Sequence, residues 1–359
     1  MLEGIPPVLY ALGFSWRKRP LVRQFFGGRE IKFIDCVTSV PEGATVAVWA
    51  SGPLGCGWPA GLPGSAPASG SRRMPGIRFT RLFLEDGFLR SVGLGADLVR
   101  PLSWVIDRRG IYYDASQPSD LEHGLQTWVF EDAQLARAAQ FRQNLVASGT
   151  TKYNVGSQTW SRPGQARQKP VVLVTGQVET DASIRYGAPA TKTNMTLLGA
   201  ARQTHPDAWL VYKPHPDVVA GLRGQGTQAA QAAGWCDQIV TDVSMGTLLD
   251  AVDIVHVMTS LAGFEALLRG KQVVCHGLPF YAGWGLTQDV LPISRRTRRL
   301  TIDELVAGTL LEYPTYVSRA TRQICTAEQA LAELQEWRSS ARSELPFWRK
   351  IVRSVLKRA

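Results

Sequence analysis

Short apolar runs rich in Val, Ile and Leu alternate with helical patterns along this chain, and this alternation limits its fold more than any other feature. Parallel strands joined by crossover helices produce such a pattern. The chain has 359 residues, 45% of them hydrophobic, which is enough for two domains with separate cores. We therefore predict an α/β protein. The expected strands are residues 8–12, 45–49, 79–84, 171–175, 209–212, 254–258 and 272–275.

A polar, basic and glycine-containing segment at residues 148–170 is typical of a linker between domains. We place the boundary near residue 165. The predicted units are an N-terminal Rossmann-like domain over 1–165, a second such domain over 166–310, and C-terminal helices over 311–359.

Other segments indicate local structure. Few helix breakers occur in residues 122–147, 301–311 and 327–342, which we expect to be helical. Residues 52–76 are rich in Pro and Gly, so they predict an irregular loop where a crossover helix would normally stand.

The charge balance favours anionic partners. The 40 Lys and Arg against 30 Asp and Glu give a net charge of +10, which suits phosphates, nucleotides, anionic lipids or acidic sugars. We do not expect nucleic acid as a partner, because no long basic tract, zinc-finger spacing or RNA-binding aromatic signature occurs. Residues 346–359 have the pattern of a basic amphipathic helix, which would either dock on its own domain or lie on an anionic membrane surface.

The sequence also favours a cytoplasmic location, with contact to the inner face of the cytoplasmic membrane through that basic helix. Its five scattered cysteines form no CxxC pair, as in proteins of a reducing compartment. No apolar run is long enough to span a bilayer, and the N-terminus lacks the basic residues of a signal peptide.

Polar turns follow several predicted strands. In open α/β sheets ligands bind at the carboxyl ends of strands, so we expect the three turns after residue 175 to line one crevice. These three turns are GQVETDAS at 176–183, KPHPD at 213–217 and TSLAGFEALLRGK at 259–271. A similar turn, LEDGFLRSVGLG at 84–95, follows an earlier strand.

Two of these turns are suited to a phosphate. Thr259 and Ser260 stand at the start of a predicted helix with Gly263 in its first turn, where amides and hydroxyls can bind an anion, although an ordinary capped helix has the same pattern. In KPHPD, the prolines fix the directions of Lys213 and His215. His215 can donate to a leaving phosphate with Lys213 as electrostatic partner, or both can be structural.

Glu179 and Asp181 follow another strand, with Arg185 close behind. Paired acids on a turn are commonly solvated or capping residues. In a crevice that binds phosphate, however, a carboxylate would repel the anion. Its presence there is explained if it does chemistry on the sugar side of the donor. No Cys, His or carboxylate cluster has metal-ligand spacing, and no Walker or GxGxxG motif occurs, so we expect neither a metal nor a cofactor.

Six ordered motifs, taken together, are similar to those of a known family. They are GFSWRKR (13–19), LEDGFLRSVGLG, GIYYDASQPSDLE (110–122), GQVETDASI, KPHPD, and SLAGFEALLRGK with PFYAGWGLTQD (279–289). Across most of its length the chain resembles the capsule polysaccharide biosynthesis family, specifically the KpsC-type retaining β-Kdo transferases, where Kdo is 3-deoxy-D-manno-oct-2-ulosonic acid. Members usually carry two such modules, and this chain has one.

The resemblance implies a GT-B-like pair of Rossmann-type domains with a central cleft. It implies CMP-β-Kdo as donor, a glycan or lipid-linked saccharide as acceptor, and a place beside the capsule assembly machinery. Asp181 matches the catalytic acid, proposed to form a covalent Kdo-enzyme intermediate, and His215 lies near the CMP phosphate. By the same resemblance, Thr259 and Ser260 bind phosphate and Glu265 contacts the cytidine or ribose.

On the acceptor side, the resemblance makes Glu85 and Asp86 candidates to position or deprotonate the acceptor hydroxyl, and lets Arg90 meet the Kdo carboxylate. The remaining expected substrate-binding residues are Gln177, Glu179, Arg185, Lys213 and Gly263.

The chain departs from its relatives' pattern after Trp49. Similar proteins continue into an amphipathic helix, whereas here the Pro- and Gly-rich stretch runs to residue 76, which we interpret as a helix lost or replaced through a reading-frame disturbance. Two other functions stay open. One is transfer of a related nonulosonate, such as sialic acid, from its CMP donor. The other is non-catalytic binding of a nucleotide sugar within the export machinery.

Overall fold

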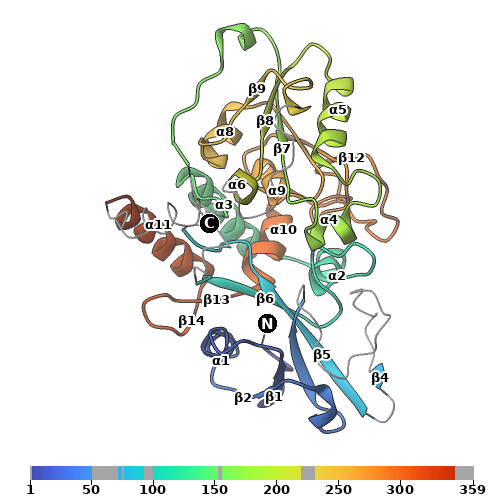
Figure 1. Cartoon of the computed structure of the whole chain (residues 1–359). Helices are drawn as coiled ribbons and strands as arrows, with labels where there is room; N and C mark the ends of the chain where they lie inside the picture. The colour runs from blue at the N-terminus through green and yellow to red at the C-terminus, as the bar shows by residue number, and fades with distance from the viewer. Residues whose placement is uncertain are drawn as a thin grey trace, which may run out of the picture.

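The strands of the chain form two sheets, one above the other in Figure 1. The structure, a computed structural model, describes residues 2–50, 72–74, 77–92, 100–152, 156–219 and 231–343, and the statements below concern these residues. The predicted helix at residues 346–359 lies outside them, as does the predicted loop at 52–76 except for residues 72–74.

The first sheet has the strand order β14-β13-β6-β5-β3-β1-β2, with β4 paired to β5. β1, β2, β3 and β5 run parallel, whereas β6 is antiparallel to β5 and β13 is antiparallel to β6. The bounds are β1 (Val8–Leu12), β2 (Glu30–Ile34), β3 (Thr45–Trp49), β4 (Arg72–Met74), β5 (Ile77–Asp86), β6 (Ser103–Asp107), β13 (Pro314–Val317) and β14 (Ile324–Cys325).

The prediction of parallel strands throughout is therefore wrong for this sheet. After β5 the chain turns back and forms β6 beside it. The amide of Gly87 donates to the carbonyl of Ser103 at 2.9 Å, which continues the antiparallel pairing. A Cβ at Gly87 would lie 2.3 Å from Oγ of Ser103, so only glycine allows this close approach.

The second sheet is entirely parallel, with the order β12-β11-β10-β7-β8-β9. The four strands expected between residues 171 and 275 are confirmed. Their side chains are nearly all buried, as expected for strands covered on both faces. The bounds are β7 (Val171–Thr175), β8 (Trp209–Lys213), β9 (Gln238–Ile239), β10 (Ile254–Val257), β11 (Gln272–Cys275) and β12 (Gln288–Asp289).

The helices pack around both sheets (Figure 1). A π-helix, η4 (Ala307–Glu312), follows α10, and short 3-10 turns occur at η1 (Val37–Ser39) and η3 (Gly164–Ala166). The α-helices are α1 (Arg19–Phe25), α2 (Asp120–Thr127), α3 (Asp132–Ala147), α4 (Ala182–Gly187), α5 (Asn194–Thr204), α6 (Pro216–Val219), α8 (Met245–Ala251), α9 (Leu261–Leu267), α10 (Ile302–Val306) and α11 (Ala327–Ser343).

The single helix expected over residues 122–147 is in fact two. Trp128 ends α2 in an extended conformation, and a capping box between Glu131 and Gln134 begins α3. Trp128 lies so close to α2 that a Cβ at Gly124 would be 2.3 Å from its ring. The indole of Trp128 thus lies directly against Gly124, where any side chain would clash with it.

The segment interpreted as a linker is buried at Thr150 and Thr151, whereas its described residues from 156 to 170 are mostly exposed. Ser157 forms a bridge with Val243 beside the second sheet. Later, β13 and β14 return the chain to the first sheet, in a region where we predicted only helices. The two halves are therefore joined by two crossings of the chain.

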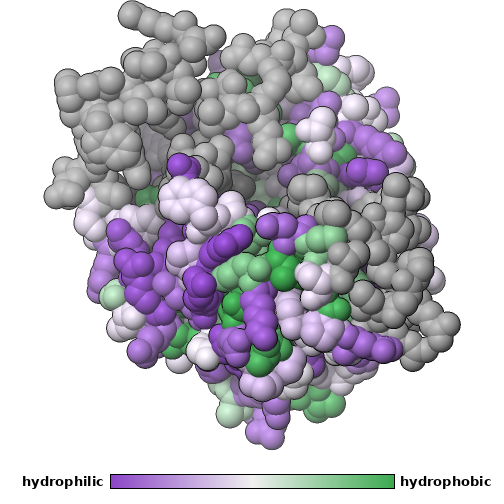
Figure 2. Space-filling model, turned by 60° about the horizontal axis from the view of Figure 1, so that its bottom comes forward, coloured by the Kyte–Doolittle hydropathy of each residue, from purple (hydrophilic) through white to green (hydrophobic). Residues whose placement is uncertain are grey.

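One hydrophobic cluster continues between the sheets. It joins residues of the first sheet and its loops, such as Phe88 and Val105, to residues of the second sheet and its helices, such as Leu173 in β7 and Phe264 in α9. At the far end of the first sheet, hydrophilic and apolar side chains are interspersed on the surface (Figure 2). Trp16, which follows β1, is 74% exposed, with the guanidinium of Arg17 over its ring.

Candidate active site at the carboxyl ends of the two sheets

The strand order of the second sheet reverses between β7 and β10, and such a reversal is where open α/β sheets bind ligands. Gln177 follows β7 and Thr259 follows β10. The side-chain amide of Gln177 donates to Oγ1 of Thr259 at 3.0 Å, and the backbone amide of Thr259 donates to Oε1 of Gln177 at 2.9 Å. These two bonds join the turns on either side of the reversal.

Hydrogen bonds with Asn194, the first residue of α5, hold the turn after β7 in place. The backbone amide of Gln177 donates to Oδ1 of Asn194 at 2.9 Å, and Nδ2 of Asn194 donates to the carbonyl of Gln177 at 3.0 Å. Oε1 of Glu179 accepts from the amide of Asn194 at 2.7 Å. Glu179, expected to bind substrate, thus serves the start of α5 in this structure.

Asp181 is the N-cap of α4, so the capping interpretation of this acid is correct. Its Oδ1 accepts from the amide of Ser183 at 2.9 Å and from the hydroxyl of Ser183 at 2.7 Å. Two bonds to one oxygen fix the orientation of the carboxylate. Arg185 is exposed, with its guanidinium over the ring of Tyr186.

The turn after β8 touches the turn after β7. A Cβ at Gly176 would lie 3.0 Å from Cα of Pro214 and 3.2 Å from the amide of His215. The three turns that we expected to line one crevice therefore lie side by side. Nδ1 of His215 accepts from the amide of Asp217 at 3.2 Å, so the neutral ring carries its proton on Nε2.

Lys213 differs from the expectation that its ammonium would serve a phosphate. Its Nζ donates to the carbonyl of Val243 at 2.6 Å, and the side chain is buried. Burial lowers the pKa of Lys213 from its ordinary value. Its ammonium therefore links β8 to the turn that precedes α8.

The turn after β10 leads into α9. Ser260 is the N-cap, with Oγ accepting from the amide of Ala262 at 3.2 Å, and the hydroxyl of Tyr281 donates to the carbonyl of Ser260. Gly263 lies directly against Tyr281, because a Cβ there would be 2.3 Å from the phenol oxygen. The absence of a side chain at Gly263 is thus required for packing, whatever ligand the turn binds.

An acid pair ends β5 in the first sheet. Nε of Arg90 donates to Oδ2 of Asp86 at 2.6 Å, so the cation expected to meet a substrate carboxylate is held by Asp86 here. Burial, and then the charge of Asp86, raise the pKa of Glu85 to about 7. A carboxyl group with that pKa can exchange protons near neutral pH.

Sequence reasoning missed Lys18 and Trp49 as members of this site. The first sheet also reverses its order, between β1 and β3, and Lys18 follows β1 while Trp49 ends β3. Nζ of Lys18 lies 3.5 Å from the centroid of the Trp49 ring. Burial lowers the pKa of Lys18, and the charges of Asp86 and Glu85 oppose that shift. The GFSWRKR motif at residues 13–19 contains Lys18 and could have indicated this residue from the sequence.

Tyr112 and Tyr113 connect the acid pair at the end of β5 to the turns that follow strands of the second sheet. The hydroxyl of Tyr112 donates to the carbonyl of Asp86 at 3.3 Å. The carbonyl of Tyr113 would lie 3.2 Å from a Cβ at Gly187, which would also be 2.9 Å from Cγ2 of Thr259. The carboxyl ends of the two sheets therefore meet.

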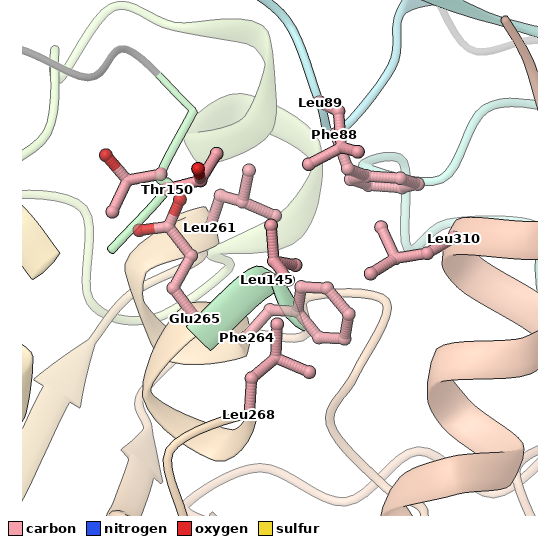
Figure 3. A pocket seen from close by; sticks show the side chains of 10 residues that line it. Phe88, Leu89, Leu145, Thr150, Leu261, Phe264, Glu265, Leu268 and Leu310 are labelled. Atoms are coloured by element: carbon pink, nitrogen blue, oxygen red, sulfur yellow. The ribbon is translucent and has the colours of Figure 1, made fainter. Parts of the chain in front are cut away.

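A cavity of about 20 Å³, enough for about one water molecule, lies at this meeting (Figure 3). Phe88, which follows β5, packs on Phe280 at 4.8 Å and on Phe264 at 6.3 Å between ring centroids. Glu265 lines the same cavity, and burial raises its pKa. Its Oε1 accepts from the amide of Lys152 at 2.8 Å, so in this structure Glu265 holds the chain after α3.

Among the described residues, no group of three or more His, Cys, Asp or Glu side chains is arranged to hold a metal ion. No helix in the same part of the chain has the length and apolarity to cross a membrane.

Two Rossmann-type sheets that meet at their carboxyl ends define a GT-B-like fold. The family model described as "Capsule polysaccharide biosynthesis protein" matches residues 72–318. The chain belongs to this family, and its relatives make it a KpsC-type member.

Similar proteins include the "Capsule polysaccharide modification protein LipA" of Neisseria meningitidis serogroup B, 44% identical over 90% of this chain and 44% of LipA. The "Lipopolysaccharide-processing protein LpsZ" of Rhizobium meliloti is 43% identical over 70% of this chain and 58% of LpsZ. The chain thus spans less than half of LipA.

Two solved structures from Thermosulfurimonas dismutans each cover 91% of this chain and are themselves covered to 98%. The KpsC beta Kdo 2,7 transferase is 35% identical with a TM-score of 0.71. The KpsC beta Kdo 2,4 transferase is 28% identical with a TM-score of 0.73.

Proposed function

We propose that this chain is a glycosyltransferase module that moves Kdo from CMP-β-Kdo to a glycan or glycolipid acceptor, with retention, in capsule or surface polysaccharide biosynthesis. The observation that carries the proposal is the likeness to two Kdo transferases over 91% of the chain. The joined turns at the reversal of the second sheet support a donor site there.

In the first step, the carboxylate of Asp181 attacks the anomeric carbon of Kdo, and the bond from that carbon to the phosphate oxygen of CMP breaks. Because Oδ1 of Asp181 already accepts two hydrogen bonds from Ser183, Oδ2 is the oxygen that forms the new bond. The Nε2 proton of His215, with Thr259 and Ser260, stabilises the charge that develops on the departing phosphate.

In the second step, Glu85 takes the proton of the acceptor hydroxyl, whose oxygen attacks the same carbon and releases Asp181. Two displacements at one carbon give net retention. A pKa of about 7 suits Glu85 to this role, since a base works best when its pKa is near the working pH. CMP is a good leaving group, so the scheme requires no metal.

The deciding experiment compares Asp181→Ala with the control variant Asp207→Asn. Asp207 is exposed and lies in the turn before β8. We expect Asp181→Ala to lose Kdo transfer while it still binds CMP in calorimetry, and Asp207→Asn to retain both. Intact mass spectrometry of the wild type with CMP-Kdo should detect a Kdo adduct that is missing in Asp181→Ala. Full activity of Asp181→Ala would reject the mechanism.

The donor sugar needs its own test. Hydrolysis of CMP-Kdo is compared with hydrolysis of CMP-sialic acid under the same conditions, and we expect only CMP-Kdo to be consumed. Faster consumption of CMP-sialic acid would favour a sialyl-type transferase. Tight CMP binding with no turnover of either donor, on any acceptor, would favour a non-catalytic member of the assembly machinery.

A further inference from the structure

The ammonium group of Lys18 lies on the face of Trp49. Nζ of Lys18 is 3.5 Å from the centroid of the Trp49 ring, which is close enough for a direct cation–π contact. The backbone of Lys18 is held as well, because its amide donates to the carbonyl of Ser15 at 2.9 Å. A contact at each end of the residue therefore fixes the position of the ammonium.

Trp49 is itself a firm support for this cation. It ends β3, and its ring packs edge-on against Trp104 at 5.3 Å between centroids, while Trp104 stacks on Phe25 at 4.4 Å. Phe25 is the last residue of α1, and Lys18 is the N-cap of the same helix. The three rings thus tie both ends of α1 to the first sheet and hold the ammonium at the end of β3.

This support lies at the carboxyl edge of the first sheet, beside the acid pair of β5. Trp49 pairs with Leu84 in the parallel register of β3 and β5, and the acid pair follows Leu84 directly. Trp104, against which Trp49 packs, stands opposite Asp86 in the β5–β6 pair. Strand register and ring contacts together therefore place Lys18 next to the segment that is expected to face the acceptor.

No carboxylate pairs with this ammonium among the residues that the structure describes, because Lys18 forms no ion pair there at 4.0 Å or less. The two other cations expected to meet substrate are already bound. Arg90 donates to Asp86, and Lys213 donates to the carbonyl of Val243. Lys18 is partly buried, and a partly buried charge without a counter-ion is unfavourable. An anion that binds at this edge would supply the missing counter-ion.

We propose that Lys18, supported on Trp49, binds a carboxylate of the sugar substrate at the carboxyl edge of the first sheet. The inference rests on the proposed function, which supplies an acidic sugar as substrate. An ammonium on an aromatic face keeps N–H donors on its outer side, and such donors suit carboxylate oxygens. The charge of Asp86 does not cancel this attraction, since Arg90 offsets it at 2.6 Å.

The carboxylate can come from the donor Kdo or from an acidic sugar of the acceptor. Lys18 lies at the first sheet, whereas the joined turns of the donor site, at Gln177 and Thr259, lie at the second. We therefore expect the acceptor to supply it.

Binding of a carboxylated probe tests the proposal without any transfer reaction. The probe is the methyl β-glycoside of Kdo, and it is compared with its uncharged carboxamide in ligand-observed NMR titrations of the full chain. The wild type should bind the acid about tenfold more tightly than the carboxamide, and Lys18→Met should lose most of this preference. Lys18→Arg keeps a cation that can stack on Trp49, so it should retain the preference.

The control for the binding test is Lys169→Met, which changes an exposed lysine and should behave like the wild type. Circular dichroism and thermal unfolding check the fold of each variant. Lys18→Gln covers the case in which Lys18→Met does not fold, because it removes the charge but keeps a polar side chain. A wild-type preference for the acid probe in either folded variant would overturn the assignment.

Steady-state kinetics of Kdo transfer distinguish the two sources of the carboxylate. Lys18→Met should raise KM for the acceptor and leave KM for CMP-Kdo unchanged, whereas a rise confined to CMP-Kdo would support a contact with the donor sugar. A wild type that binds the acid probe through Lys18 but transfers no Kdo would reject the proposed function alone. Normal transfer with both KM values unchanged in Lys18→Met would reject the role of Lys18 alone.

Discussion

Gln177 and Thr259, which are 82 residues apart, exchange two hydrogen bonds across the point where the strand order of the second sheet reverses. The pair joins the segment that carries Asp181 to the segment that begins α9. Because Gln177 is buried, loss of either partner leaves polar groups without compensation.

Gln177→Leu should lower the free energy of unfolding by about 1–3 kcal/mol, since it removes both bonds. Thr259→Val removes only the bond to the hydroxyl. In a double-mutant cycle measured by urea unfolding, the two changes should be less than additive, because they break the same side-chain contact. Strict additivity would contradict a direct interaction in solution.

The rate of Kdo transfer should fall as the pH falls through about 7, because the base must be ionised and the pKa of Glu85 is raised to about 7. Asp86→Asn removes the like charge that contributes to this shift. The acid limb of its pH profile should therefore move to lower pH, although the loss of the Arg90 partner can lower the maximal rate. An acid limb that stays in place in Asp86→Asn would argue against Glu85 as the base.

Acid should destabilise the fold through a chain of three histidines. Nε2 of His256 lies 3.1 Å from Nε2 of His205, and Nδ1 of His256 lies 3.0 Å from Nε2 of His276. Burial, and then the neighbouring histidines, lower the pKa of His256 from 6.5 to about 3. Between these values the unfolded chain binds a proton that the folded chain does not, so stability is lost as the pH falls from 6.5 toward 3.

The slope is expected to be at most about 1.4 kcal/mol per pH unit for this one proton. Urea unfolding between pH 7.5 and 5 measures it. His256→Gln should flatten the dependence, whereas His123→Gln, at an exposed histidine of α2, should retain it. Equal slopes in the wild type and in His256→Gln would show that other groups control acid stability.

Glu122 joins α2 to the segment that follows the second sheet. It accepts from Nε of Arg296 at 2.9 Å and also from Arg295, and Arg296 donates to the carbonyl of Ala282 at 2.7 Å. Since Glu122 and Arg296 are buried, Glu122→Gln should cost about 3 kcal/mol of unfolding free energy.

The matched control for this change is Glu328→Gln. Glu328 pairs with Arg137 at 2.8 Å, but both side chains are more than 40% exposed, so its loss should cost less than about 1 kcal/mol. Equal losses in the two variants would contradict a special role for the buried pair.

Gly263→Ala should destabilise the protein by about 1–3 kcal/mol, because the new methyl group would lie 2.3 Å from the phenol oxygen of Tyr281. Tyr281→Phe removes that oxygen. Thermal unfolding of the double variant should show a smaller additional loss from Gly263→Ala than the single variant shows. The same loss in both backgrounds would indicate that backbone propensity, rather than the contact, is responsible.

Much of this architecture could be predicted from local sequence. The strands of the second sheet and the turns that follow them depend on apolar runs and on glycines and prolines within a few residues of one another. The return of β13 to the first sheet could not be predicted in this way, because its partner β6 is distant in the sequence.

In the candidate site, too, some features follow from the local sequence and others depend on the tertiary structure. Asp181 as a helix cap and Ser260 as the start of α9 follow from residue type and spacing. The use of Glu179 at α5, of Lys213 at Val243 and of Arg90 at Asp86 depends on which segments the fold brings together.

The sequence by itself determined the fold class and the strand-end positions of the acids and of His215, because hydrophobic periodicity and turn chemistry act over short stretches of chain. Only the tertiary structure decided which of these groups can ionise near neutral pH. The pKa of a carboxyl group such as Glu85 depends on its burial and on charges such as Lys152, which folding brings from a distant segment.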